Sequence, residues 1–208
     1  MGCGGSRCRL GVLASGSGTN LEAIARAIDD NDLPAAIVIV ISDKPGAPAL
    51  ERAARRRIRT LVVEERAFVR RRDYDRAVVE ALEQAGVDLV VLAGYMKLAG
   101  PEMVDAFRGR MINVHPSLLP SFPGTSAVDD ALAHGVKVSG ATVHFVDEGL
   151  DTGPIITQEA VEVLEGDTPG TLHQRIHLAE YRLLPRAIRL FAGGRLVIEG
   201  RRVKVLPG

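Results

Sequence analysis

The stretch Met111–Gly124, which reads MINVHPSLLPSFPG, decides the fold class of this chain. It begins as an apolar strand that carries two polar residues, Asn113 and His115. The strand stops at Pro116, because proline has no backbone N–H to donate to a sheet. Residues two apart on a strand point to the same face, so the Asn and the His lie together while their apolar neighbours point into a core. The stretch therefore predicts a buried strand with a polar pair at its carboxyl end.

Short apolar runs and longer amphipathic runs alternate on both sides of this stretch. The apolar runs predict strands, and the runs with a 3.6-residue period predict helices. Strands are expected at 9–15, 36–42, 59–63, 87–94, 111–115, 140–146 and 154–163. Helices are expected at 20–30, 47–57, 73–86, 101–107, 127–135 and 171–191, with a final hairpin at 195–206.

This alternation, with strands that are apolar throughout, predicts a Rossmann-like doubly wound α/β fold whose mostly parallel sheet is covered on both faces. The last strands are not separated by full helices, so antiparallel C-terminal strands are expected. No linker, repeat or low-complexity segment divides the 208 residues. We therefore expect a single domain over 1–208, in which residues 1–8 form a flexible tail.

The charge balance excludes some classes of function. Lys and Arg together number 26, and Asp and Glu together also number 26, so the formal net charge is zero. A general nucleic-acid binder is normally basic, so no nucleic-acid partner is expected. No apolar run approaches the ~20 residues that span a membrane, and no secretory signal is visible. We therefore expect a cytoplasmic protein without a membrane partner, and leave its oligomeric state open.

Both cysteines, Cys3 and Cys8, lie in the opening MGCGGSRC. A disulfide between them would close only a short loop, so we interpret them as reduced thiols in the tail of a cytosolic protein. The tail also matches the myristoylation pattern M-G-x-x-x-S, but a Gly-rich leader with a chance match is the favoured interpretation. The two Cys and five His show no metal-ligand spacing, so no metal is expected.

In a doubly wound fold, ligands bind outside the carboxyl ends of the strands, so the loops that follow strands are candidate sites. The first is ASGSGTNLEAI, Ala14–Ile24. Its glycines allow close backbone approach, and Thr19 and Asn20 are candidate caps of a helix whose N-terminus suits a phosphate. The loop resembles a dinucleotide-binding G-x-G-x-x-G, with Asp43 as a candidate ribose-binding acid, but Leu21 replaces the third Gly. Phosphate binding is favoured over a purely structural turn.

Two other loops belong to the same edge of the sheet as the Asn–His pair. DEGLDTGP, Asp147–Pro154, offers three carboxylates, and their spacing does not decide which one faces a pocket. AGYMKLAGP, Ala93–Pro101, offers Met96 and Leu98 either as walls of an apolar slot or as part of the core. A polar pair at the tip of a central strand favours a functional site over a purely structural one.

Five motifs occur in one order along the chain: VLASGSGTNLEAI, AGYMKLAG, INVHPSLLPSFPG, GATVHFVDEGLDTGPII and HLAEYRLLP. With these motifs in this order, the chain resembles the folate-dependent phosphoribosylglycinamide formyltransferases. The resemblance extends from Leu10 to about Pro207. HPSLLP marks the wider formyl-folate family, which includes the enzyme that formylates initiator tRNA and formyltetrahydrofolate deformylase. The SGSGTN loop and the short length favour the glycinamide ribonucleotide branch of purine synthesis.

The resemblance implies a formyltransferase fold and the transfer of a formyl group from 10-formyltetrahydrofolate to glycinamide ribonucleotide, both small molecules, without a metal. It implies a catalytic trio of Asn113, His115 and Asp151. The residues implied to bind the ribonucleotide are Gly18, Thr19, Asn20, His177 and Glu180. Those implied to bind the folate are Arg71, Met96, Lys97, Leu98, Ala99, Asp147, Glu148, Gly149 and Leu150.

The chemistry explains the residue types of the trio. Attack of the amine on the formyl carbon forms a tetrahedral oxyanion, which an amide N–H of Asn113 and a protonated His115 can stabilise. A carboxylate at Asp151 would favour the charged imidazole and can order a water that carries the amine proton. His144, inside an apolar strand, is interpreted as a satisfied core residue.

Two departures and two alternatives accompany the resemblance. Lys97 and Ser126 stand where family members usually carry Arg and many carry His. A nicotinamide-dependent oxidoreductase is the first alternative, suggested by the glycines and Asp43, and the missing third Gly counts against it. A non-catalytic formyl-folate sensor is the second, and the intact Asn–His–Asp set counts against it.

Overall fold

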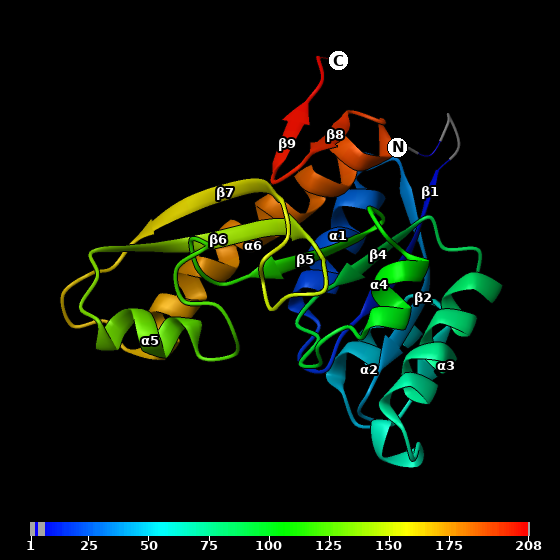
Figure 1. Ribbon diagram of the computed structural model, residues 1–208. Helices are drawn as coiled ribbons and strands as arrows, with labels where there is room; N and C mark the ends of the chain where they lie inside the picture. The colour runs from blue at the N-terminus through cyan, green and yellow to red at the C-terminus, as the bar shows by residue number, and fades with distance from the viewer. Residues whose placement is uncertain (1–2, 4–6, 208) are drawn as a thin grey trace.

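The computed structural model describes Cys3 and residues 7–207, and its strands and helices match the expected ones to within two residues at each end (Figure 1). The strands are β1 Cys8–Leu13, β2 Ala35–Ser42, β3 Thr60–Val62, β4 Leu89–Leu92, β5 Met111–His115, β6 Val138–Phe145, β7 Ile155–Glu162, β8 Leu196–Glu199 and β9 Arg202–Val205. The helices are α1 Thr19–Asp29, α2 Pro48–Arg55, α3 Arg71–Gln84, α4 Pro101–Ala106, α5 Ala127–Ala133 and α6 Pro169–Ala192. A short 3-10 turn, η1 Glu65–Ala67, was not expected from the sequence.

Within the described residues, nine strands form one sheet in the order β3-β2-β1-β4-β5-β6-β7-β9-β8. The pairs β2–β3, β1–β2, β1–β4 and β4–β5 are parallel, whereas β5–β6 and β6–β7 are antiparallel. The prediction of a mostly parallel sheet with antiparallel C-terminal strands is confirmed. The strand order reverses between β1 and β4, and in open α/β sheets such a reversal leaves a crevice at the carboxyl ends of the two strands.

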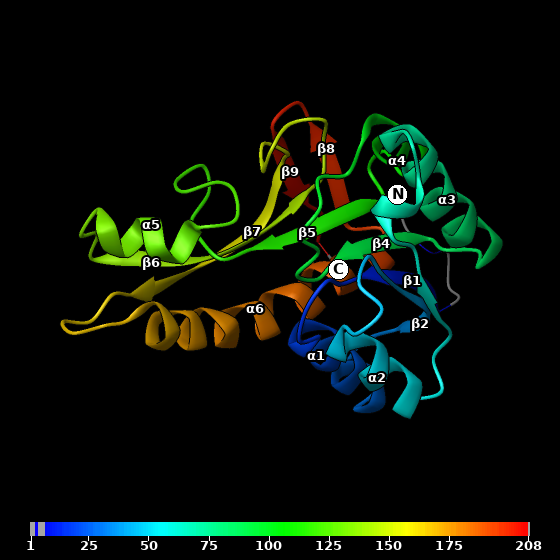
Figure 2. The ribbon, with the colours of Figure 1, turned by 90° about the horizontal axis from the view of Figure 1, so that it is seen from below.

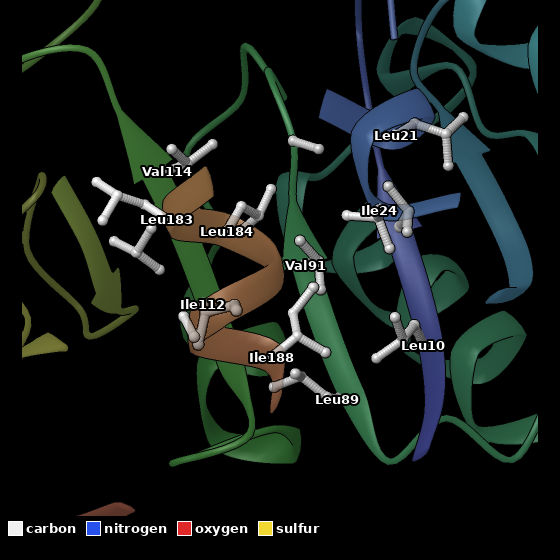
Figure 3. Packing of buried hydrophobic residues seen from close by; sticks show 14 of the residues in the cluster. Leu10, Leu21, Ile24, Leu89, Val91, Ile112, Val114, Leu183, Leu184 and Ile188 are labelled. Carbon is white, nitrogen blue, oxygen red and sulfur yellow. The ribbon is translucent and has the colours of Figure 1, made fainter. Parts of the chain in front are cut away.

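Helices cover both faces of the parallel part of the sheet (Figure 2). Residues of α1, α2 and α6 pack on one face, and residues of α3 and α4 pack on the other. Figure 3 shows the first of these layers, where Leu184 and Ile188 of α6 pack near Val91 of β4 and Ile112 of β5. Burial of these side chains is the main force that holds the layers together, at about 25 cal/mol per Å² of apolar surface.

Strand β5 shows why the polar pair is open to a ligand. Ile112 and Val114 pack in the core on the α6 side, whereas Met111 packs under α3 and α4. Asn113 and His115 share the face of Met111 but lie further along the strand, where they line a cavity. The alternation expected from the sequence is confirmed.

The strands β6 and β7 extend with α5 beyond the parallel part of the sheet in both views (Figures 1 and 2). α6 lies against both strands, so this extension is part of the same packed structure. The loop that joins β6 to β7 returns to the carboxyl end of β5 and carries Asp151 there.

The N-terminal segment corrects one prediction. Cys8 is the first residue of β1 and is fully buried, and Cys3 forms a disulfide with it. The Cys3 N–H donates to the carbonyl of Ala192 at the end of α6, and Cys3 packs against the core. The interpretation of both cysteines as reduced thiols is therefore wrong. Most of the myristoylation pattern lies outside the described residues.

Candidate active site

A cavity of about 480 Å³ lies at the carboxyl ends of β1, β4 and β5. The loop after β1, the loop after β4 and the loop between β6 and β7 form its walls. His173, His177 and Glu180, in the N-terminal half of α6, close one end. These are the loops that the sequence analysis selects, because a doubly wound sheet presents ligands with the ends of its strands. Asn113 and His115 lie on the wall that β5 provides.

Asp151 lies between the polar residues of β5 and β6. Its Oδ2 is 3.4 Å from His115 Nδ1 and accepts the backbone N–H of Gly124 at 2.8 Å. Its Oδ1 accepts from Asn113 Nδ2 at 3.3 Å and lies 3.6 Å from His144 Nε2. The structure therefore brings together the three residues of the expected trio, and it selects Asp151 from the three carboxylates of the loop. Asp151 has a φ of 55°, a left-handed conformation that is strained for a residue with a side chain.

Both ring nitrogens of His115 face oxygen atoms. Nε2 is 2.8 Å from the carbonyl oxygen of Phe122, which can only accept, so this nitrogen carries a proton and donates. Nδ1 faces the Asp151 carboxylate. A protonated imidazole satisfies both oxygens as a double donor, whereas the neutral ring would turn a lone pair toward the carboxylate. The ring is 4% exposed, so its orientation is fixed by these two partners.

His144 is a buried histidine with hydrogen-bond partners, as expected from the sequence, and it also contacts the site. It lies opposite Asn113 in the β5–β6 pairing, and its Nε2 is 3.2 Å from Asn113 Nδ2. Its Nδ1 donates to the carbonyl of Phe145 at 2.8 Å, and its Nε2 faces both the Asn113 amide and Asp151 Oδ1. His144 also lines the cavity. It is buried, as expected, but it holds a member of the trio in place.

The pKa of the Asp151 carboxyl lies below its usual range. Burial by itself raises the pKa, but the hydrogen bond from His144, the Gly124 N–H and the charges of His115 and His144 together outweigh burial. Asp151 is therefore ionised at neutral pH. A fixed carboxylate beside two imidazoles provides the negative charge that a protonated histidine in the cavity needs.

The loop after β1 leaves the N-terminus of α1 open to the cavity. Gly18 is the N-cap residue, with a φ of 73° and no side-chain cap, and Thr19 and Asn20 are already helical. The expectation that Thr19 or Asn20 caps the helix is therefore wrong. Free N–H groups at a helix N-terminus bind anions well. Arg52 of α2 supports the loop from behind, since its Nε donates to the carbonyl of Ser17 at 2.8 Å.

Helix α6 contributes a buried acid to the same end of the cavity. Glu180 is 3% exposed, and its Oε2 accepts from Asn20 Nδ2 and from His177 Nδ1, both at 2.8 Å. Asn20 Oδ1 is buried without a hydrogen-bond partner in the described part of the chain. His173 stacks on His177 with ring centroids 4.1 Å apart, and burial and the charge of His177 lower the pKa of His173. Neighbouring acceptors and a neutral imidazole suit the hydroxyl groups of a sugar.

The loop after β4 provides an apolar wall. Met96, Lys97, Leu98 and Ala99 all line the cavity, and Met96 and Leu98 are 55% and 52% exposed. The Met96 N–H donates to Ser15 Oγ at 2.8 Å, which ties this loop to the loop after β1. Exposed apolar side chains at the mouth of a cavity suit a flat aromatic ligand.

The opposite wall comes from the loop between β6 and β7. Gly149 and Leu150 line the cavity. Asp147 does not, and instead its Oδ1 accepts from the Gly149 N–H and from Thr152 Oγ1, so it shapes the loop from within. Glu148 faces outward and pairs with Arg108. Asp147, Glu148 and Arg71 are thus the expected site residues that stand outside the cavity wall.

Several residues that line the cavity were not selected from the sequence. They include Ser15, Lys44, Thr125, His144 and His173. Only the strand pairing and the approach of α6 bring them to the cavity, and the antiparallel β5–β6 register is the signal that would have found His144. Asp43, the candidate ribose-binding acid of the nicotinamide alternative, is buried and lines a separate hollow beside Lys44.

Potential metal ligands were also searched for in the part of the chain that the structure describes. Cys3, Cys8 and Asp88 have sulfur and oxygen atoms within 4.8 Å of one another, but the two sulfurs are joined in a disulfide. They lie at the amino ends of β1 and β4, at the opposite end of the strands from the cavity. No helix of the described residues is long and apolar enough to cross a membrane.

A model of the formyl transferase family matches residues 8–188, which reach from the first residue of β1 into the C-terminal half of α6. The chain belongs to the formyl transferase family. The match includes every loop of the cavity wall, so the formyl transferase assignment covers the whole site and not only the fold. It confirms the resemblance that the sequence motifs carry.

Relatives and solved structures place the chain more closely within the formyl transferases. It is 43% identical to phosphoribosylglycinamide formyltransferase of Bacillus subtilis (strain 168) over 89% of this chain and 95% of the relative. The structure of glycinamide ribonucleotide transformylase 1 from Symbiobacterium toebii is 54% identical, with a TM-score of 0.96, over 98% of this chain and 96% of that chain. A formyltetrahydrofolate deformylase from Pseudomonas syringae pv. tomato str. DC3000 has a TM-score of 0.89 at 27% identity, and this chain covers 67% of it. The formyltransferases and the deformylase therefore share this fold. In sequence identity and in length, this chain is more similar to the formyltransferases.

Proposed function

We propose that the protein transfers the formyl group of 10-formyltetrahydrofolate to the amine of glycinamide ribonucleotide, as one step of purine synthesis. The observation that carries this proposal is the meeting of Asn113, His115 and Asp151 at one cavity. Two relatives that this chain covers over 95% and 89% of their own length are named for this activity. The cavity lies between an open helix N-terminus and an apolar loop, so it offers one end to a phosphate and the other to a pterin ring.

The ribonucleotide occupies the end formed by α1 and α6. Its phosphate accepts hydrogen bonds from the backbone N–H groups of Gly18, Thr19 and Asn20, where the helix dipole adds a partial positive charge. Its ribose hydroxyls donate to Glu180, and His177, one turn earlier on α6, holds that carboxylate in place. This orientation directs the glycinamide amine toward Asn113 and His115.

The folate occupies the end formed by the loops after β4 and β6. Its ring lies between the loop of Met96, Lys97, Leu98 and Ala99 on one side and Gly149 and Leu150 on the other. Asp147 shapes this second wall from within the loop, whereas Glu148 faces outward and pairs with Arg108. Arg71 completes the folate end from behind the first loop.

The amine nitrogen forms a bond to the formyl carbon, and the bond from that carbon to N10 of the folate then breaks. Between these steps the formyl oxygen carries a negative charge. Protonated His115, whose two N–H groups face Phe122 and Asp151, stabilises this oxyanion by its positive charge. An amide N–H of Asn113 donates to the oxyanion in place of its 3.3 Å contact with Asp151. The amine loses one proton and N10 gains one. A water ordered by the Asp151 carboxylate carries the proton from the amine to N10.

Other formyl-folate activities and other classes are weaker candidates. A deformylase would pass the formyl group to water, and the deformylase structure that resembles this chain has about a third of its length without a counterpart here. A nicotinamide enzyme would need a ribose-binding acid in the cavity, but Asp43 faces a different hollow. A folate sensor would have no use for an ionised Asp151 beside two imidazoles. We propose small-molecule partners only, no metal, and a cytoplasmic location, on the family resemblance.

The test uses the purified chain with 10-formyltetrahydrofolate, with and without glycinamide ribonucleotide. We expect tetrahydrofolate and formylglycinamide ribonucleotide in equal amounts, detected by absorbance and mass spectrometry, and no turnover without the ribonucleotide. Release of formate at the same rate without the ribonucleotide would establish the deformylase instead. Binding of the folate with no product in either case would establish the sensor.

A further inference from the structure

The loop after β5, residues 116–126, supplies a carbonyl group that orients His115. This carbonyl belongs to Phe122 and accepts from His115 Nε2 at 2.8 Å. Phe122 has a φ of 54°, a left-handed conformation that a bulky residue rarely adopts. Such a conformation persists only where the surrounding structure holds it in place. The orientation of His115 therefore depends on the groups that hold Phe122.

Ser117 is the side chain that contacts this turn from within the loop. It is fully buried and stands outside the cavity wall, so it has no part in the chemistry proposed above. Its Oγ donates to the carbonyl of Ser121 at 2.5 Å and lies 3.3 Å from the carbonyl oxygen of Phe122. One hydroxyl thus faces the carbonyl groups of two successive residues, and the second of these is the acceptor for His115.

The backbone of Ser117 is itself fixed to the sheet. Thr142 of β6 is fully buried, and its Oγ1 donates to the Ser117 carbonyl at 2.7 Å. The same oxygen accepts from the Leu119 N–H at 3.1 Å and from Gln158 Nε2 of β7 at 2.9 Å. Thr142 also stands opposite His115 in the β5–β6 pairing. A buried network whose polar groups are hydrogen-bonded is rigid, so the Ser117 hydroxyl has a fixed place relative to the imidazole.

We propose that Ser117 is a positioning residue whose hydroxyl holds the Phe122 carbonyl where His115 Nε2 can donate to it. The inference rests on the proposed function for what this imidazole does in catalysis, but the contact itself does not depend on that function. Without the hydroxyl, Phe122 can relax from its left-handed conformation and turn its carbonyl away. His115 then loses one of the two oxygens that orient its ring. A small displacement of a group beside the reacting atoms is enough to slow a reaction strongly.

The kinetic test compares Ser117→Ala with Ser139→Ala. Ser139 of β6 is 2% exposed and its Oγ has no hydrogen-bond partner among the described residues, so the control also removes a buried hydroxyl. For Ser117→Ala we expect kcat to fall by about 10-fold while both KM values stay within about twofold. Ser139→Ala should behave as wild type. An unchanged kcat in Ser117→Ala, equal losses in the two variants, or a rise in KM without a fall in kcat would overturn the inference.

Proton NMR without substrates tests the contact itself. The Nε2–H signal of His115 is assigned by its absence in His115→Ala. Its exchange with water should be at least about 5-fold faster in Ser117→Ala than in the wild type, and unchanged in Ser139→Ala. A wild-type exchange rate in Ser117→Ala would overturn the inference.

Thermal melts show whether each variant is folded. If Ser117→Ala does not fold, Ser117→Cys takes its place, since a thiol is close in size to the hydroxyl and is only a weak donor. The same fall in kcat and the same faster exchange are then expected, each smaller than for a complete loss of the donor. If the wild type shows no turnover, the proposed function fails, and the exchange of the His115 Nε2–H still decides whether Ser117 positions the imidazole.

Discussion

At the scale of single residues, His115 is the group on which the proposed chemistry depends most. Its Nε2 is engaged by Phe122 and its Nδ1 faces Asp151, so the ring is held in a fixed orientation in the wall of the cavity. We expect His115→Ala to lower kcat by about 10²- to 10⁴-fold, with a smaller change in KM. Asn113→Ala should behave alike, and the double variant should lose much less than the product of the two, because both act on one transition state.

The control for this prediction is His134→Ala. His134 stands at the end of α5 and does not line the cavity. Steady-state kinetics of the wild type and the four variants, each checked by thermal melting, provides the test. If His115→Ala stays within threefold of the wild type, the role assigned to His115 is wrong.

Asp151 gives a prediction on pH as well as on turnover. Burial raises the pKa of its carboxyl, but the hydrogen bonds from His144 and Gly124 and the nearby imidazole charges lower it by more than burial raises it. The pKa is therefore lower in the folded chain than in the unfolded chain. Such a group stabilises the fold above its unfolded pKa of about 4, and the stabilisation is lost as the pH falls through the folded pKa. Asp151→Asn should therefore lower Tm at pH 7, and its deficit against wild type should shrink below about pH 4.

The same variant should lose most of its turnover at pH 7, because an amide cannot hold His115 charged. Asp105→Asn is the matched control, an exposed acid on α4 that pairs only with Arg108 among the described residues. Melting curves from pH 3 to pH 8 and kcat at pH 7 provide the two measurements. A Tm deficit that grows as the pH falls would show that Asp151 does not act as a carboxylate.

The residues of the site differ in how far the sequence could predict them. Asn113 and His115 follow from strand periodicity and from the proline that ends the strand, so no tertiary information is needed. Asp151 required the family resemblance, because three acids share its loop. His144 was interpreted as core, and only its place opposite Asn113 in the β5–β6 register reveals that it holds the Asn113 amide.

At the scale of elements, the N-terminus of α1 makes a prediction about the ribonucleotide. Gly18 has a φ of 73°, and a Cβ there would stand 2.7 Å from Ala49 Cα. Gly18→Ala should therefore displace the loop against α2 and raise KM for glycinamide ribonucleotide by about 10-fold or more, while KM for the folate stays unchanged. Gly46→Ala, with open space at its Cβ, is the control. Equal changes in both KM values would mean that the loop only maintains the fold.

Most elements could be predicted because their local signals agree with their tertiary roles. The β-branched run of β2 and the amphipathic period of α3 are visible in the sequence and are unchanged by packing. The turn η1 was missed because three residues give no periodic signal. Its importance appears only in three dimensions, where Glu65 reaches both Arg71 and Lys97.

At the scale of the whole molecule, the sequence predicts the class of the sheet but not how distant segments meet. The approach of α6 to α1 brings Glu180 to Asn20 across 160 residues of sequence. Cys3 contacts the end of α6 and is joined to Cys8, which no spacing argument predicts. Both contacts depend on the order in which strands and helices stack, and this order is a property of the complete core.

The central claim is that one cavity brings two substrates together at Asn113, His115 and Asp151. A crystal structure of the protein with glycinamide ribonucleotide and a non-transferring formyl-folate analogue tests it most directly. The account predicts the phosphate within hydrogen-bond distance, about 2.7–3.2 Å, of the backbone N–H groups of Gly18–Asn20. It predicts the amine about 3–3.5 Å from the analogue's formyl-equivalent carbon, with the oxygen on that carbon facing Asn113 and His115. A phosphate bound elsewhere, or an amine directed away from this pair, would contradict the account.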